Sequence, residues 1–311
     1  MTTEIVVTVP LMDTVMAELA AGYTLHRLWE APERAEFLAE IGEPVRAIAT
    51  DGAAGADAAL IDALPNLEII ACCGVGIDGI DIARAREREI PVTNTPDVLT
   101  DDVADMALAL LLANCRRLCA GDRFVRAGRW RDGAMALARS LGGKRVGIVG
   151  LGRIGRAVAA RTAAFGCRLA YHGPRRKPDV DHEYYPDLVE MARACDFLVV
   201  TCTGGAATRG LVGRAVIDAL GADGGLINVS RGSVVDQPAL VEALAAGRLG
   251  SAALDVFADE PDVPEPLLTM DNVVLQPHMG SATEETRGAM GRLVIDNLAA
   301  HFAGRPLLTP V

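Results

Sequence analysis

The sequence predicts an α/β protein built from two doubly wound, parallel-sheet domains. Three observations lead to this prediction. The chain has 311 residues, about twice the length of a common domain. Half of its residues are apolar, which is enough for two cores. Short β-branched runs alternate with longer segments of helical periodicity, a pattern typical of parallel sheets with helices on both faces.

Ten short runs rich in β-branched residues end at glycine, proline or polar turn residues, as strands do. They are residues 5–9, 47–50, 67–71, 92–93, 146–149, 168–171, 197–201, 225–228, 251–255 and 273–276. One doubly wound sheet rarely holds that many strands without strain, so we expect two sheets.

Segments of helical periodicity lie between these strands or follow them. They are residues 12–21, 56–63, 103–119, 156–165, 185–194, 214–220, 238–246 and 284–302. The long segment 103–119 is apolar on nearly all sides, which predicts a buried helix. Asp101, Asp102 and Asp105 lie at its start, where the helix dipole favours negative charge.

The basic segment 121–131 interrupts the alternation and places Trp130 among arginines. One interpretation is a surface loop. The other is an arm that packs on a second copy of the chain, because tryptophan and arginine are favoured as interface anchors. The second interpretation predicts a homodimer, in which Trp130 could reach a partner's substrate.

The formal net charge is −11, from 41 acidic and 30 basic residues. Such a chain is repelled by phosphate backbones and anionic lipid, so we expect neither nucleic acid nor a membrane surface as a general partner. A small anion would need a local group of cations. The longest uncharged apolar stretch of the long helix, 106–115, has ten residues, whereas a membrane span needs about 20.

The first nine residues carry no basic leader and predict a strand instead of a signal peptide. Seven cysteines are scattered without paired CxxC spacing, so we expect buried, reduced thiols and no metal site. Cys72 and Cys73 are expected to be small core residues. Together these features predict a cytoplasmic protein.

A glycine-rich turn, GLGRIG at 150–155, follows the strand at 146–149 and precedes a helix. This is the context that a dinucleotide-binding fingerprint requires. Gly150 would allow the tight turn, Gly152 would let the backbone approach a pyrophosphate, and Gly155 would let the helix press against the sheet. Amides at the helix start would then stabilise the phosphates.

The next strand ends where an acidic residue would bind the ribose hydroxyls of NAD, about twenty residues beyond the glycines. The chain instead carries Arg175, Arg176 and Lys177 there. Arginine binds phosphate through two parallel charge-assisted hydrogen bonds. The pattern therefore favours NADP(H), with NAD(H) remaining possible.

Three later strands each end near one ionisable group, namely Arg231, Glu260 and His278. In a doubly wound sheet the carboxyl ends of the strands line one crevice, so these groups are expected to converge. They suit the reduction of a 2-oxo acid. Arg231 would pair with the substrate carboxylate, His278 would deliver the proton, and Glu260 would orient the imidazole.

Together these motifs resemble the D-isomer-specific 2-hydroxyacid dehydrogenases, most nearly the glyoxylate/hydroxypyruvate reductase branch. The resemblance covers the whole chain. It rests on residues 74–78 (GVGID), 94–101 (NTPDVLTD), 150–155 (GLGRIG), 228–232 (NVSRG), 254–261 (LDVFADEP) and 276–281 (QPHMGS).

The resemblance implies a role for each matched residue. Arg231, Glu260 and His278 would be catalytic. The backbone amides of Val75 and Gly76 would hold the substrate carboxylate, and Arg231 and His278 would also contact the substrate. It also implies that Arg153, Ile154, Thr203, Val229, Ser230, Asp255, His278 and Gly280 line the cofactor site, where Arg231 is expected as well. The glycines Gly150, Gly152 and Gly155 and the arginines Arg175 and Arg176 join this site on the arguments given above, and the two arginines depart from the family, most of whose NAD-using members have an acidic residue there.

The resemblance also implies a Rossmann-type cofactor domain, residues 100–282, inserted into a flavodoxin-like substrate domain, residues 1–99 and 283–311. Substrate would then bind in a crevice that closes during hydride transfer. The small residues near 49–53 leave room for a substrate side chain without specifying it.

The expected activity is NADPH-dependent reduction of glyoxylate, hydroxypyruvate or a similar 2-oxo acid to the D-2-hydroxy acid. Hydroxyphenylpyruvate, phosphite, formate and 3-phosphoglycerate remain alternative substrates, because enzymes that act on them resemble this chain in fold and triad. A nucleotide-sensing protein similar to the C-terminal-binding corepressors is the alternative from another class.

Overall fold

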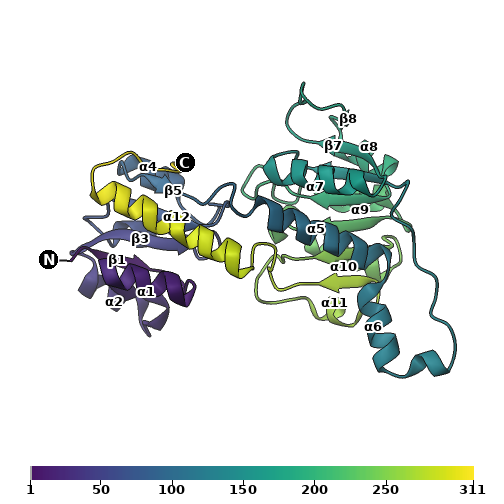
Figure 1. The fold of residues 1–311 in the computed structure, drawn as a ribbon, viewed down its shortest axis with the longest axis horizontal. Helices are drawn as coiled ribbons and strands as arrows, with labels where there is room; N and C mark the ends of the chain where they lie inside the picture. Colours follow the sequence, from purple (N-terminus) through teal and green to yellow (C-terminus); the bar gives the residue numbers. More distant parts are fainter. Residues whose placement is uncertain (1) are drawn as a thin grey trace. The chain divides into compact units, whose positions relative to one another are not determined.

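The computed structural model describes residues 2–311 and divides into two compact units (Figure 1). Unit 1 comprises Met1–Leu99 and Thr283–Val311, and unit 2 comprises Thr100–Ala282. Unit 2 is therefore inserted into unit 1, and the chain passes between the units twice.

Unit 1 is built on a sheet of five parallel strands in the order β2-β1-β3-β4-β5. The strands are β1 (Glu4–Val7), β2 (Thr24–Arg27), β3 (Val45–Asp51), β4 (Ile69–Cys73) and β5 (Val92–Thr93). This is the flavodoxin-like order, in which the direction of winding reverses between β1 and β3.

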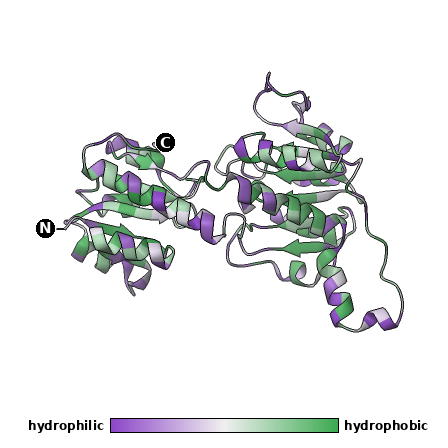
Figure 2. Cartoon of the chain, in the orientation of Figure 1, coloured by the Kyte–Doolittle hydropathy of each residue, from purple (hydrophilic) through white to green (hydrophobic). Residues whose placement is uncertain are grey.

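The helices of unit 1 are α1 (Asp13–Gly22), α2 (Arg34–Ile41), α3 (Ala58–Asp62), α4 (Ile82–Glu87) and α12 (Glu284–Phe302). The long helix α12, yellow in Figure 1, packs against β4 and α1. One face of the sheet buries Ile48, Ile70 and Leu60. The central strands are accordingly green in Figure 2, while the helices carry purple residues.

Unit 2 is built on a sheet of seven parallel strands in the order β12-β11-β10-β9-β6-β7-β8. They are β6 (Arg145–Val149), β7 (Arg168–His172), β8 (Glu183–Tyr185), β9 (Phe197–Val200), β10 (Gly225–Asn228), β11 (Ser251–Leu254) and β12 (Val273–Leu275). Winding reverses between β6 and β9, as in a dinucleotide-binding sheet. The predicted class, two doubly wound parallel sheets, is confirmed.

The helices of unit 2 are α5 (Thr100–Cys115), α6 (Leu118–Arg126), α7 (Arg153–Ala164), α8 (Leu188–Ala194), α9 (Arg214–Leu220), α10 (Gln237–Ala245) and α11 (Glu265–Thr269). Helices α5 and α7 pack side by side. Arg161 of α7 pairs with Asp101 at 3.0 Å and Asp105 at 2.5 Å. The negative charges of Asp101 and Asp105 at the start of α5 are thus paired with an arginine, and the helix dipole favours them as well.

Two predicted helices differ from the structure. A single helix over 103–119 is wrong, because Arg117 adopts a left-handed backbone with φ of 54° between α5 and α6. A helix over 185–194 starts too early, since Tyr185 pairs with His172 in the sheet. Asp187 then caps α8 by accepting the amides of Val189 and Glu190.

The segment 121–131 is not a loop throughout. It is helical to Arg126 and ends in a 3-10 turn, Arg129–Arg131. All seven cysteines are free. Among residues 2–311 no helix is long and apolar enough to span a bilayer, and no group of histidine, cysteine or acidic side chains is arranged to hold a metal ion.

Candidate active site

Most of the predicted site residues of unit 2 lie at one edge of its sheet. The strands all run in the same direction, so the segments that follow β6, β9, β10, β11 and β12 emerge at their shared carboxyl edge. These segments carry the glycine-rich turn, Thr203, Arg231, Glu260 and His278. Ligands of doubly wound sheets bind at this edge.

The glycine-rich turn has the geometry of a phosphate-binding loop. Gly150 has φ of 96°, and a Cβ atom there would lie 2.6 Å from the Cys202 Cα. A Cβ at Gly155 would lie 2.3 Å from the Gly150 oxygen, whereas one at Gly152 would meet no atom within 4 Å. The backbone is therefore open at Gly152, directly before the amides that begin α7, and these residues fit a dinucleotide pyrophosphate.

The loop after β7 presents the cations that favour a 2′-phosphate. Its position is set by the 2.9 Å ion pair between Arg156 of α7 and Asp179, and by the Lys177 amide, which donates to the Tyr171 hydroxyl at 2.7 Å. Arg175 and Arg176 are exposed. Neither side chain forms a hydrogen bond or ion pair with any of the residues that the structure describes.

Residue His278 lies beside Glu260, as required of a proton donor and its orienting carboxylate. The imidazole Nδ1 is 2.7 Å from Glu260 Oε2. Glu260 Oε1 accepts the Phe257 amide at 2.9 Å, which fixes the carboxylate in place. Nδ1 is thus engaged, and Nε2 is the ring nitrogen left to exchange a proton with a ligand.

The pKa of Glu260 lies below its ordinary value. Partial burial alone would raise it, but the hydrogen bonds from His278 and the Phe257 amide outweigh burial. The positive charge of Arg231 lowers it further, as does His278 when its ring is protonated. The influence of Arg231 shows that all three predicted catalytic groups are close enough to interact electrostatically.

Arg231 is held by a buried asparagine that the sequence analysis did not single out. Asn228, 1% exposed, donates from Nδ2 to the Arg231 carbonyl at 3.0 Å. Its Oδ1 accepts the Ser230 amide at 3.0 Å and the Ser230 hydroxyl at 3.1 Å. A Cβ at Gly232 would lie 1.9 Å from the Phe257 carbonyl carbon, so this turn is in backbone contact with the segment that carries Glu260.

Asp255 supports the turn that carries His278. It is 1% exposed, and its two carboxylate oxygens accept the Met279 amide at 2.7 Å and the Gly280 amide at 2.8 Å. Desolvation raises its pKa, and these hydrogen bonds offset the rise only in part. His278 itself has φ of 54°, an uncommon conformation that this turn maintains. Asp255 and Gly280, predicted as cofactor contacts, therefore bond to each other.

The remaining predicted cofactor residues are spread along the same edge. Thr203 is exposed after β9, and its carbonyl accepts the Thr208 hydroxyl at 2.7 Å. Val229 and Ser230 are buried after β10. Arg153 is exposed and Ile154 half-buried in the first turn of α7.

In unit 1, Val75 and Gly76 follow β4 in a half-buried loop. The Gly74 carbonyl accepts the Thr95 amide at 2.9 Å, and the Val75 carbonyl accepts Asn94 Nδ2 at 3.0 Å. A Cβ at Gly79 would lie 2.8 Å from the Gly52 oxygen. The loop is therefore packed against the segment after β3, where room for a substrate side chain was predicted.

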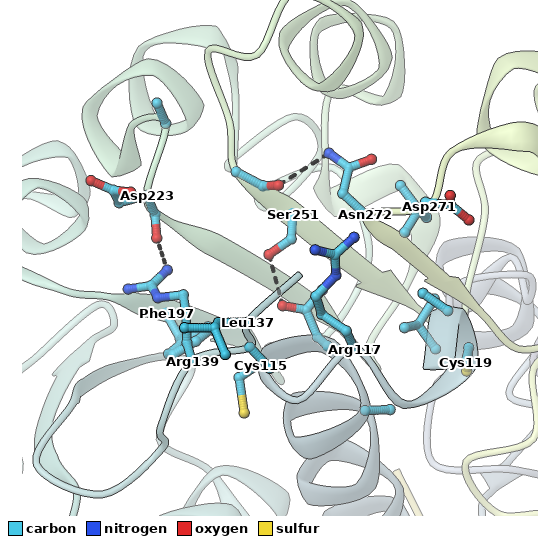
Figure 3. Close-up of a pocket in the computed structure, with 18 residues that line it drawn as sticks. Cys115, Arg117, Cys119, Leu137, Arg139, Phe197, Asp223, Ser251, Asp271 and Asn272 are labelled. Atoms are coloured by element: carbon cyan, nitrogen blue, oxygen red, sulfur yellow. Dashed lines mark hydrogen bonds between the residues drawn. The ribbon is translucent and has the colours of Figure 1, made fainter. Parts of the chain in front are cut away.

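A separate cavity of about 290 Å³ lies at the amino ends of β9, β11 and β12 (Figure 3). Phe197, Ser251 and Val273, the first residues of these strands, line it together with Arg117 and Arg139. It is at the opposite edge of the sheet from His278 and contains none of the predicted site residues.

Burial keeps three of the cysteine thiols in their unreactive, protonated form. Burial raises the pKa of Cys73 to about 11, of Cys195 to about 12 and of Cys202 to about 11. Each of these thiols is therefore protonated near neutral pH, as expected of core residues.

Comparison with known proteins agrees with this geometry. Residues 108–280 match the family model described as D-isomer specific 2-hydroxyacid dehydrogenase, NAD binding domain. The chain is 52% identical over 302 residues to a glyoxylate/hydroxypyruvate reductase A of Arabidopsis thaliana, covering 97% of this chain and 96% of that protein. It is 51% identical, with the same coverage, to a hydroxyphenylpyruvate reductase of Plectranthus scutellarioides.

Solved structures show the same likeness. An NADPH-dependent glyoxylate/hydroxypyruvate reductase from Sinorhizobium meliloti, in complex with NADP and malonate, is 46% identical to this chain. The two superpose with a TM-score of 0.93, over 100% of this chain and 97% of that one.

Proposed function

The chain belongs to the D-isomer specific 2-hydroxyacid dehydrogenase family, and from this premise we propose that it reduces a small 2-oxo acid to the D-2-hydroxy acid with NADPH. The substrates proposed are glyoxylate, hydroxypyruvate or a close analogue. The observation that carries the proposal is the His278–Glu260 pair, 2.7 Å apart, at the same sheet edge as the open glycine turn.

The cofactor, when bound, supplies the hydride. Gly150, Gly152 and Gly155 with the amides that begin α7 bind its pyrophosphate. Arg175 and Arg176 bind the 2′-phosphate, and NADH, which lacks this phosphate, is therefore expected to be the poorer donor. Arg153, Ile154, Thr203, Val229, Ser230, Asp255 and Gly280 complete the proposed cofactor site.

The chain's own residues bind and protonate the substrate. Arg231 pairs with the substrate carboxylate and polarises the 2-oxo group, with the amides of Val75 and Gly76 as further ligands of the carboxylate. His278 Nε2 gives its proton to the carbonyl oxygen as that oxygen gains negative charge. Glu260 keeps Nδ1 protonated and stabilises the charged ring. On this proposal unit 1 serves as the substrate domain and unit 2 as the cofactor domain.

The test is a kinetic panel. Purified protein is mixed with NADPH or NADH and with glyoxylate, hydroxypyruvate, pyruvate or 4-hydroxyphenylpyruvate, and the loss of reduced nicotinamide absorbance is followed. Rapid oxidation of NADPH by one of the small acids supports the proposal, and no oxidation with any of them contradicts it. The similarity to the Plectranthus enzyme makes 4-hydroxyphenylpyruvate the second candidate substrate.

We also propose that the chain forms a homodimer through α6 and the segment after it. Apolar side chains are exposed there, with Leu118 at 57%, Trp130 at 70% and Leu137 at 96%. Such exposure in one region is typical of an interaction surface. Sedimentation of the wild type and of Trp130→Ala would test this, and a monomeric wild type would contradict it.

A cytoplasmic location is part of the same proposal. Seven free cysteines are usual in a reducing compartment and unusual in an oxidising one. Fractionation of the source cells with a tagged chain would test it.

A further inference from the structure

Residues outside the loop after β4 fix the direction of two of its backbone amides, those of Val75 and Gly76, which are available to bind an anion. Within residues 2–311, the N–H groups of Val75 and Gly76 make no hydrogen bond, although both residues are half-buried. The carbonyls that precede these amides are bonded, Gly74 O to the Thr95 amide at 2.9 Å and Val75 O to Asn94 Nδ2 at 3.0 Å.

These bonds fix the direction of the two amides. In a trans peptide the C=O and the following N–H lie in one plane and point in opposite directions. Holding the Gly74 carbonyl therefore orients the Val75 N–H, and holding the Val75 carbonyl orients the Gly76 N–H. Two oriented, unengaged amides in succession bind an anion without having to reorganise first.

Asn94 is itself held by the segment that follows α12. Thr309 Oγ1 donates to the Asn94 carbonyl at 2.6 Å, and the Asn94 amide donates to the Thr309 carbonyl at 3.2 Å. The buried Asn297 of α12 donates from Nδ2 to Thr309 Oγ1 at 2.9 Å. Its Oδ1 accepts the amides of Leu308 and Thr309 at 3.0 and 3.2 Å. A continuous set of hydrogen bonds thus joins α12 to the Val75 carbonyl.

We propose that Asn94 is a positioning residue that aligns the Gly76 amide for the substrate carboxylate, and that Thr309 holds Asn94 in place. The inference rests on the proposed function, because it takes a 2-oxo acid as the anion. Asn94 acts through the peptide 75–76 and does not itself touch the substrate. Its loss is expected to weaken substrate binding more than turnover, because the hydride and proton donors lie in unit 2.

The test compares Asn94→Ala and Thr309→Val with the wild type. Asn94→Ala removes the bond to the Val75 carbonyl and is expected to raise KM for the preferred 2-oxo acid about tenfold, since one hydrogen bond to a charged group is misaligned. Thr309→Val keeps side-chain volume but loses both hydroxyl bonds, and a rise of about threefold is expected. The kcat and the Kd for NADPH should change by less than about twofold.

A matched control is Asn66→Ala. Asn66 also donates from Nδ2 to a carbonyl, that of Glu43 at 2.8 Å, at the surface of the same unit. It should leave KM unchanged. Thermal unfolding of each variant identifies any loss of fold, and oxamate, a non-reducible analogue, gives the dissociation constant directly. In labelled wild-type protein, oxamate should shift the Val75 and Gly76 amide resonances.

The outcomes separate the two proposals. An active wild type whose Asn94→Ala variant has the KM and oxamate affinity of Asn66→Ala overturns the positioning role and leaves the proposed function intact. A variant that loses kcat and NADPH affinity as much as substrate affinity also overturns it, since a general structural defect would do this. A wild type that reduces no 2-oxo acid overturns the proposed function and this inference together.

Discussion

The Nδ1 atom of His278 lies 2.7 Å from the Oε2 atom of Glu260, across 18 positions of sequence. A different backbone feature fixes each partner. Glu260 accepts the Phe257 amide. His278 has a left-handed backbone, and Asp255 accepts the two amides that follow it, those of Met279 and Gly280. The geometry of the pair is therefore set by contacts within the protein itself. A proton donor needs such a preset geometry, because no free energy is then spent on rearranging the side chains during the reaction.

Replacing His278 should abolish proton delivery while leaving cofactor binding. We expect His278→Ala to lower kcat by about 10² to 10⁴, with the Kd for NADPH nearly unchanged. A matched control is His26→Ala, because His26 Nε2 lies 2.7 Å from Glu4 Oε2 in a pair of the same kind in unit 1. Steady-state kinetics decide the matter, and a normal kcat for His278→Ala would place the proton donor elsewhere.

The depressed pKa of Glu260 predicts a pH-dependent contribution to stability. Its ordinary pKa is 4.5, and the folded value is lower. The ionised carboxylate therefore stabilises the fold above pH 4.5, and this contribution is lost as pH falls through the folded pKa. The free energies of unfolding of the wild type and of Glu260→Gln, measured with urea, should differ at neutral pH and become equal in acid.

The neighbouring exposed carboxylate provides the control for that experiment. Asp259→Asn removes one negative charge at the adjacent position, so it shows how much of the effect on stability comes from the change in net charge alone. A difference in free energy of unfolding between the wild type and Glu260→Gln that increased in acid would contradict the prediction.

Removing both arginines after β7 should change cofactor choice. Arg175→Ala with Arg176→Ala is expected to weaken NADPH binding at least tenfold, because a phosphate loses its charge-assisted hydrogen bonds. NADH has no phosphate at that position and should be affected less than about twofold. The control pair is Arg193→Ala with Arg214→Ala, which removes two charges bound to Glu190 and Glu242 in the same unit. Equal losses for NADPH and NADH would remove the argument for a phosphate site.

The interior of both sheets was predictable because buried strands carry β-branched runs. The edge strands β2 and β8 escaped prediction. Their residues, Thr24–Arg27 and Glu183–Tyr185, are mostly polar or half-exposed and hold their place by pairing with β1 and β7. The break between α5 and α6 was not predicted, for another reason. The apolar pattern continues across Arg117, and only its backbone conformation ends the helix.

The position of Arg231, Glu260 and His278 at one sheet edge was predictable, and the contacts that hold them there were not. Arg231, Glu260 and His278 lie in distinctive motifs at strand ends. Asn228 and Asn94 lie in the same kinds of motif, but their partners are backbone atoms of turns, and such contacts leave no pattern in residue type. The available indication was a polar residue at the carboxyl end of a buried strand, as the last residue of β10 for Asn228 and directly after β5 for Asn94.

The role of Asn228 can be tested with a substitution of nearly equal size. Asn228→Asp still accepts the Ser230 amide but cannot donate to the Arg231 carbonyl, so Arg231 should lose its fixed position. We expect kcat/KM to fall about tenfold, since one hydrogen bond and its geometry are lost. The control is Asn272→Asp, whose Nδ2 donates to the Gly250 carbonyl at 3.0 Å at the other edge of the sheet. Equal kinetics for the two variants would contradict the assignment.

Two glycines of unit 2 should respond oppositely to the same added methyl group. At Gly152 a Cβ meets no protein atom within 4 Å, so Gly152→Ala should keep the stability of the wild type. It should nevertheless weaken NADPH and NADH alike, about tenfold or more, because the methyl group occupies the approach to the pyrophosphate. At Gly232 the Cβ would lie 1.9 Å from the Phe257 carbonyl carbon, so Gly232→Ala should lower stability by about 1–3 kcal/mol through overpacking. Thermal unfolding and cofactor titration of both variants separate the effects. A Gly152→Ala variant with unchanged affinity for both cofactors would show that the dinucleotide does not pass over this turn.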